Sequence, residues 1–89
     1  MQVEGIRAGA REQRALGRAV REMRARRGWS QETLGERAGL HRNYVQSIEA
    51  GKINATFRTL LRLVGGLRVP LSELVAVYER QLADGPQGR

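Results

Sequence analysis

The spacing of apolar residues in the middle of the chain constrains its fold more than any other feature. Leu34 and Ala38 are four residues apart, so they lie on one face of a helix. The next residue is a glycine, which adopts the left-handed backbone conformation that ends helices at no steric cost. Val45 and Ile48 are three residues apart and define the buried stripe of a second helix. The spacing therefore predicts two short helices joined by a tight turn.

The outward positions of the second helix carry hydrogen-bonding side chains and no carboxylate. These positions are Arg42, Asn43, Gln46 and Ser47. Arginine can bind guanine O6 and N7 with two hydrogen bonds, and asparagine or glutamine can bind adenine N6 and N7 in the same way. The pattern favours a helix that reads bases in a DNA major groove. The alternative is an ordinary polar helix surface.

Residues 31–50 resemble the helix-turn-helix of the lambda-repressor/Cro (XRE) family. Apolar residues occupy the fourth, eighth, tenth, fifteenth and eighteenth positions, and glycine occupies the ninth. The resemblance extends over roughly residues 16–78. It departs at Gly35, where the family usually has alanine, and a glycine inside a helix costs about 1 kcal/mol relative to alanine. A closer approach of the two helices would explain that glycine. A second departure is Ala55, where the family often has proline, with no functional consequence.

The resemblance implies roles for several residues. It implies a DNA contact at Gln31, at a helix N-terminus where amide hydrogens favour phosphate. It implies an ion pair between Arg24 and Glu49 that clamps the first helix to the recognition helix. It also implies a homodimer through the C-terminal region, since family members commonly dimerise there. We assign Val77 and Leu82, two apolar residues partly off the core stripe of the last helix, to that interface.

Further phosphate contacts are expected around the recognition helix, where they would fix its register on DNA. His41 precedes this helix, and either a phosphate contact or a plain turn residue fits its position. Tyr44 would pack its ring beside the preceding helix while its hydroxyl reaches phosphate. Lys52 and Asn54 lie in the following loop, and Arg58 is close to that loop.

Residues around the motif are interpreted mainly in structural terms. Ser30 is predicted to cap the helix that follows it. Trp29 is expected to cover the core as a lid, with stacking on bases as the alternative. Glu32 and Glu36 are expected to be solvated and to face away from DNA. The first helix also carries a solvated basic face made of Arg11, Arg14, Arg18, Arg21, Arg26 and Arg27.

Apolar periodicity predicts three more helices, at residues 11–27, 57–67 and 70–83. The last of them has its expected core face at Leu71, Leu74, Val75 and Tyr78. The chain is therefore expected to be an all-α, compact five-helix domain over residues 11–83. Residues 1–10 are predicted to form a flexible arm, which could also reach a DNA groove, and residues 84–89 a disordered tail.

Composition limits the function. The chain has 89 residues, a formal charge of +7 and a pI near 11.4, which indicates a polyanionic partner, nucleic acid before membrane. A bias in coding-sequence base composition is an alternative source of the arginines. The sequence has no cysteine and one histidine, so we expect no disulfide, no metal site and no cofactor. It has no apolar run of the roughly 20 residues that span a bilayer, and we expect a cytoplasmic protein.

These patterns predict a transcriptional regulator that binds a near-palindromic operator in double-stranded DNA as a homodimer and that blocks or contacts polymerase. One alternative is an antitoxin that binds a toxin and regulates its own operon; another is a restriction-modification controller. A module that binds only protein is disfavoured by the polar face of the recognition helix. An enzyme is the weakest interpretation, because no serine has a base and an orienting carboxylate placed around it.

Overall fold

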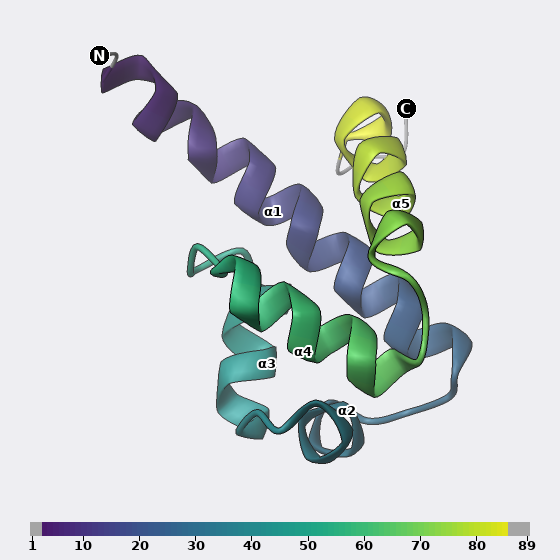
Figure 1. Ribbon diagram of the computed structural model, residues 1–89. Helices are drawn as coiled ribbons and strands as arrows, with labels where there is room; N and C mark the ends of the chain where they lie inside the picture. The colour runs from purple at the N-terminus through teal and green to yellow at the C-terminus, as the bar shows by residue number, and fades with distance from the viewer. Residues whose placement is uncertain (1–2, 86–89) are drawn as a thin grey trace.

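Five helices and no strand make up residues 3–85, the part of the chain that this computed structural model describes; side chains are described for residues 9–85. The helices are α1 (Val3–Arg26), α2 (Gln31–Ala38), α3 (Arg42–Glu49), α4 (Phe57–Leu67) and α5 (Leu71–Asp84). The expectation of an all-α, five-helix fold is confirmed (Figure 1). The bounds predicted for the helix at residues 57–67 are those observed for α4.

The long helix α1 organises the arrangement of the other elements. It packs against α3 and against α5, while α2 packs against both α3 and α4. Figure 1 shows α2 and α3 at one end of the molecule and α5 at the other. The recognition helix and the C-terminal helix therefore lie on well-separated parts of the surface.

The core is aliphatic, as the low aromatic content of 4% requires. Its largest fully buried side chains are Val20, Leu34, Val45, Ile48, Leu63, Leu67 and Leu74. Trp29 is half-buried against this cluster, and the Arg37 guanidinium carbon lies 4.6 Å from the centre of its ring. Trp29 therefore covers the core, and its exposed face is occupied by a cation–π contact.

Side chains cap the short helices and fix where they begin. Ser30 Oγ accepts from the Thr33 amide at 3.0 Å, and Thr56 Oγ1 accepts from the Thr59 amide at 3.1 Å. Gly39 ends α2 with φ 72°, in the left-handed region that favours glycine. The turn of the helix-turn-helix therefore begins at a left-handed glycine.

Two glycines inside helices allow close contact between backbones. A Cβ atom at Gly35 would lie 2.5 Å from the Leu40 carbonyl oxygen, so the departure from alanine at this position has a steric cause. A Cβ atom at Gly17 would lie 2.4 Å from the Ile48 carbonyl oxygen. Helix α1 therefore approaches the end of α3 more closely than any side chain at position 17 would permit.

The prediction of a loose arm over residues 1–10 is wrong for residues 3–10, because α1 begins at Val3. This segment contains no proline, and each residue added to an existing helix gains a backbone hydrogen bond at little further cost. Residues 1–2 lie outside the described residues. At the other end Asp84 is the last residue of α5, Gly85 caps the helix, and residues 86–89 lie outside the described part.

The C-terminal helix is rotated relative to the predicted core stripe. Val77 is only 6% exposed and packs in the core, so its assignment to a dimer interface is wrong. Val75, predicted to be buried, is exposed, and Leu82 is half-buried. The rotation places the polar Gln81 on the face that meets α1, where it accepts from Arg18 Nε at 3.1 Å. Apolar spacing alone cannot detect a buried face that includes a glutamine.

Candidate nucleic-acid interface

The outer face of α3 presents the four predicted base-contacting residues together. Val45 and Ile48 anchor the opposite face of the helix in the core. This arrangement leaves Arg42, Asn43 and Gln46 exposed and Ser47 half-buried. Residues at i, i+1, i+4 and i+5 share one side of a helix, so these donors and acceptors form one surface.

An ion pair between α1 and α3 fixes the orientation of that surface. Arg24 Nε donates to Glu49 Oε2 at 2.7 Å and its second amino group donates to Oε1 at 2.9 Å, the two-pronged geometry of the strongest ion pairs. Arg24 also donates to the Trp29 carbonyl at 2.7 Å. The Glu49 side chain is only 3% exposed, and its hydrogen bond raises the pKa of Arg24 above the ordinary value. The pair implied by the family resemblance is therefore present in the structure.

Gln31 belongs to the same network. Its side-chain amide donates to Glu49 Oε1 at 3.0 Å, which holds Gln31 at the N-terminus of α2 close to the end of α3. A shallow groove there is lined by Arg21, Gln31, Gln46, Glu49 and Ala50. Arg21, which the sequence places on the solvated basic face, has an exposed side chain that lies beside two candidate DNA-contacting glutamines. Its position one turn before Arg24 was the available signal.

An acidic residue of α2 lies close to the N-terminus of α3, which the sequence does not predict. His41 caps this helix, with Nδ1 accepting from the Asn43 amide at 3.0 Å. Arg42 lies 3.6 Å from the Glu32 carboxylate, and both side chains are exposed. Glu32 and Glu36 are exposed, as predicted, and they line a groove together with His41 and Arg42 at the start of α3. The tight turn brings the start of α3 beside α2, which a linear spacing rule does not reveal.

The remaining phosphate candidates are spread over the loop after α3 and the start of α4. Lys52, Asn54 and Arg58 are exposed there, and Lys52 donates its backbone amide to the Ser47 carbonyl at 3.0 Å. The Tyr44 hydroxyl instead lies 3.4 Å from Thr59 Oγ1, so it is directed into the contact between α3 and α4.

Two other features are absent from the residues that the structure describes. Residues 3–85 contain no helix with the length and apolar character needed to cross a membrane. They also contain no group of three histidine, cysteine or acidic side chains arranged to hold a metal ion.

Comparison with known proteins agrees with the geometry of the motif. A helix-turn-helix family model matches residues 20–74, which is more than half of the chain. The chain is 38% identical over 60 residues to the control protein C.SmaI of Serratia marcescens, covering 67% of this chain and 71% of that protein. It is 32% identical over 63 residues to the transcriptional regulator SutR of Escherichia coli, covering 71% of this chain and 35% of SutR. The match thus spans about a third of the length of SutR.

Solved structures of similar proteins share the fold of this chain. The restriction-modification controller protein C.AhdI of Aeromonas hydrophila superposes with a TM-score of 0.71 at 35% identity, covering 73% of this chain and 94% of C.AhdI. The clp gene regulator ClgR of Corynebacterium glutamicum superposes with a TM-score of 0.76 at 22% identity, covering 81% and 77%, and supports the fold alone. These relatives are regulators rather than enzymes. The chain belongs to the Cro/C1-type (XRE) helix-turn-helix family of DNA-binding transcriptional regulators.

Proposed function

We propose that this protein regulates transcription by binding a near-palindromic operator as a homodimer. Each copy would place α3 in a major groove, with Arg42, Asn43, Gln46 and Ser47 on base edges. Two recognition helices about 34 Å apart would then read successive turns of one face of the duplex. The observation that carries this proposal is the exposed, carboxylate-free outer face of α3, held in place by the clamp between Arg24 and Glu49.

Phosphate contacts would surround this surface. Gln31 and the N-terminus of α2 would bind one phosphate, and Arg21 is added as its neighbour because both residues line the same groove. His41, Lys52, Asn54 and Arg58 would bind further phosphates from the two ends of α3. Tyr44 would have to release its contact with Thr59 to take part. The net charge of +7 supports this electrostatic contribution.

A role as a restriction-modification controller is the form of regulation with the most specific support. Two relatives above 30% identity, C.SmaI and C.AhdI, are described as control or controller proteins. An antitoxin role with a toxin partner has no comparable support. A contact with polymerase and a cytoplasmic location remain parts of the proposal.

Footprinting on the DNA upstream of the gene tests this function. We expect two protected half-sites about one helical turn apart. The Arg42→Ala/Gln46→Ala variant should lose the protection, because each bidentate base contact is worth about 1–3 kcal/mol of discrimination. Unchanged protection in that variant, or protection without a preferred position, would reject the proposal.

A further inference from the structure

A cavity of about 300 Å³ opens between α1, the loop before α4, α4 itself and α5. This volume is at the lower end of the range found for small-molecule pockets. The apolar part of its wall comes from Leu16, Leu60, Leu71, Leu74 and Val75. Figure 1 shows α5 at the opposite end of the molecule from α2 and α3. Of the described residues that are candidates for DNA contacts, only Asn54 also lines the cavity, so a molecule bound there leaves the outer face of α3 free.

A carboxylate in the cavity wall lacks a partner. Glu12 lines the cavity, and its Oε1 atom is buried without a hydrogen-bond partner among the described residues. An oxygen that has lost water and gained no donor is costly. The Glu12 side chain as a whole is half-buried, and the last torsion of a glutamate turns easily. A small rotation of the carboxylate therefore presents this oxygen to a donor in the cavity.

The groups around Glu12 do not supply that donor. The neighbouring cation Arg11 donates instead to the Leu82 carbonyl at 3.3 Å, and no ion pair among the described residues includes Glu12. Gln13 donates its side-chain amide to the Gly51 carbonyl at 3.3 Å. Burial first, and then the charge of Glu12, raise the pKa of the Tyr78 hydroxyl, so this phenol stays neutral at pH 7. The cavity therefore combines an apolar wall with one unpaired carboxylate.

This combination selects one class of ligand. A carboxylate binds a protonated amine through a charge-assisted hydrogen bond, and an apolar wall binds a hydrocarbon group by releasing water. An anion would be repelled by Glu12, and a neutral molecule would leave its charge unpaired. Water alone would satisfy the oxygen but would leave the apolar wall hydrated. The ligand that satisfies both parts of the cavity is a small organic cation, in which an ammonium is joined to an alkyl or aryl group.

We propose that this cavity binds a small organic cation, with its ammonium paired to Glu12 and its apolar part packed against Leu16, Leu60 and Val75. Val75 is 41% exposed, so the cavity is open to solvent along α5 and a ligand can enter. The bound molecule touches α1, α4 and α5 together, so it should raise the Tm of the domain. This site is separate from the outer face of α3 and does not depend on the proposed operator.

Titration of the full chain with three probes of similar shape tests the chemistry of the site, with backbone amide shifts measured by heteronuclear NMR. The probes are phenethylammonium, the neutral phenethyl alcohol and the anion phenylacetate. Phenethylammonium should shift the amides of the residues that line the cavity. It should bind at least about tenfold more tightly than phenethyl alcohol, as a charge-assisted hydrogen bond predicts. Phenylacetate should leave these amides unshifted.

Substitution of two acidic residues tests the role of Glu12. Glu12→Gln keeps the shape of the side chain and should abolish the preference for the cation, so that phenethylammonium and phenethyl alcohol bind alike. Glu79→Gln is the matched control, because it removes the same charge from an exposed residue of α5 that does not line the cavity. This control should retain the wild-type preference. Thermal unfolding of both variants without ligand checks that the fold is intact.

Four results would overturn the proposal. The first is that millimolar phenethylammonium leaves the cavity amides of wild type unshifted. The second is that it shifts the amides of Glu32 and Glu36 equally, which would show general attraction to surface carboxylates. The third is a preference for the cation that persists in Glu12→Gln. The fourth is that the cavity amides respond to protein concentration and to none of the probes, which would assign the cavity to a second copy of the chain.

The outcome is separable from that of the proposed function. Wild type that binds phenethylammonium in the cavity without preferring any DNA sequence would reject only the operator proposal. Wild type that protects its operator while the cavity binds none of the probes would reject only this ligand site.

Discussion

Glu49 is the residue on which the orientation of the recognition helix depends most directly. Its carboxylate accepts two hydrogen bonds from Arg24 and one from Gln31, so α1, α2 and α3 meet at one side chain. Because it is nearly buried, it cannot exchange these partners for water at little cost. One acidic residue therefore joins the stability of the domain to the placement of its DNA-binding face.

Removing Arg24 should leave that carboxylate uncompensated. We expect Arg24→Ala to lower the free energy of unfolding by about 3–5 kcal/mol, measured by urea denaturation. Arg26→Ala is the control, because it removes an exposed pair with Glu22 and should cost less than about 1 kcal/mol. Equal effects of the two substitutions would show that burial of Glu49 does not matter.

Two glycine-to-alanine substitutions distinguish a glycine that close packing requires from a glycine that only lowers the stability of its helix. Gly35→Ala should destabilise the protein by about 1–3 kcal/mol, because the new Cβ would collide with the Leu40 carbonyl in the turn. Gly65→Ala should instead stabilise it by about 0.5–1 kcal/mol, since a Cβ there meets nothing within 4 Å. Thermal unfolding of both variants tests this difference in sign, and stabilisation by Gly35→Ala would contradict it.

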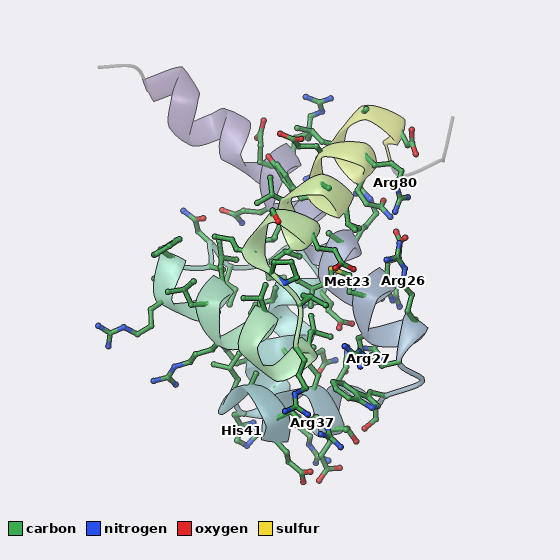
Figure 2. All side chains as sticks on the ribbon, turned by 45° about the vertical axis from the view of Figure 1, so that its right-hand side comes forward. Met23, Arg26, Arg27, Arg37, His41 and Arg80 are labelled. Carbon is green, nitrogen blue, oxygen red and sulfur yellow. The ribbon has the colours of Figure 1, made fainter. Side chains whose placement is uncertain are left out.

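At the scale of elements, α5 is attached to α1 by a polar network. Glu22 accepts from Arg26 and Arg80, and Gln81 Nε2 donates to it at 2.8 Å. Figure 2 labels the two arginines, one on α1 and one on α5. These hydrogen bonds, Arg80 first, lower the pKa of Glu22 from 4.5 to about 2. Helix α5 therefore depends on an ionised carboxylate for part of its attachment to α1.

The network predicts a dependence of stability on pH. A lowered pKa means that the contribution of Glu22 is complete above its unfolded value of 4.5 and is lost as the pH falls toward about 2. Glu22→Gln should therefore be less stable than wild type at neutral pH, by about 1 kcal/mol after solvent screening. The difference in Tm should shrink between these two pH values, and a difference that stays constant would contradict the assignment.

The N-cap of α3 gives a second test at this scale. His41→Ala should cost about 1 kcal/mol, because the Asn43 amide loses its acceptor, whereas His41→Asn should retain most of the stability. Denaturant midpoints of the two variants measure this. Equal loss in both would mean that the imidazole stabilises the turn by some other contact.

Sequence reasoning predicted the elements of the motif well and their packing less well. The bounds of α4 and the cap at Ser30 follow from local chemistry, which is visible in a linear pattern. The rotation of α5 and the start of α1 were missed. The first depends on Gln81 meeting Arg18 across 63 residues, and the second on helix extension in a segment without a strong apolar period.

At the scale of the whole molecule, the fold separates two surfaces. The outer face of α3 lies at one end of the molecule and the surface of α5 lies at the other. The four base-contacting candidates were placed on one face from sequence alone. The approach of Glu32 to Arg42 could not be predicted, because it depends on how two helices pack.

The approach of Glu32 to Arg42 should affect DNA binding. Glu32 stands 3.6 Å from a candidate base-contacting arginine, so it competes with DNA for that cation and repels phosphate. Glu32→Gln should raise affinity for operator and unrelated DNA alike, within about tenfold, measured by fluorescence anisotropy. Unchanged affinity would show that the pair is too exposed to matter.

Base reading by α3 is measured most directly by the ratio of two wild-type affinities, one for the operator DNA and one for DNA of unrelated sequence. Affinities for the DNA upstream of the gene and for a scrambled duplex would be measured over a range of salt concentrations. The Arg42→Ala/Gln46→Ala variant would be compared with the Arg80→Ala variant as a control. Arg80 lies far from His41 and the start of α3 in Figure 2. Wild type and Arg80→Ala should prefer the upstream DNA, and the double variant should bind both duplexes equally with a steep salt dependence. A preference that the double variant retains would contradict the assignment of α3 as the recognition helix.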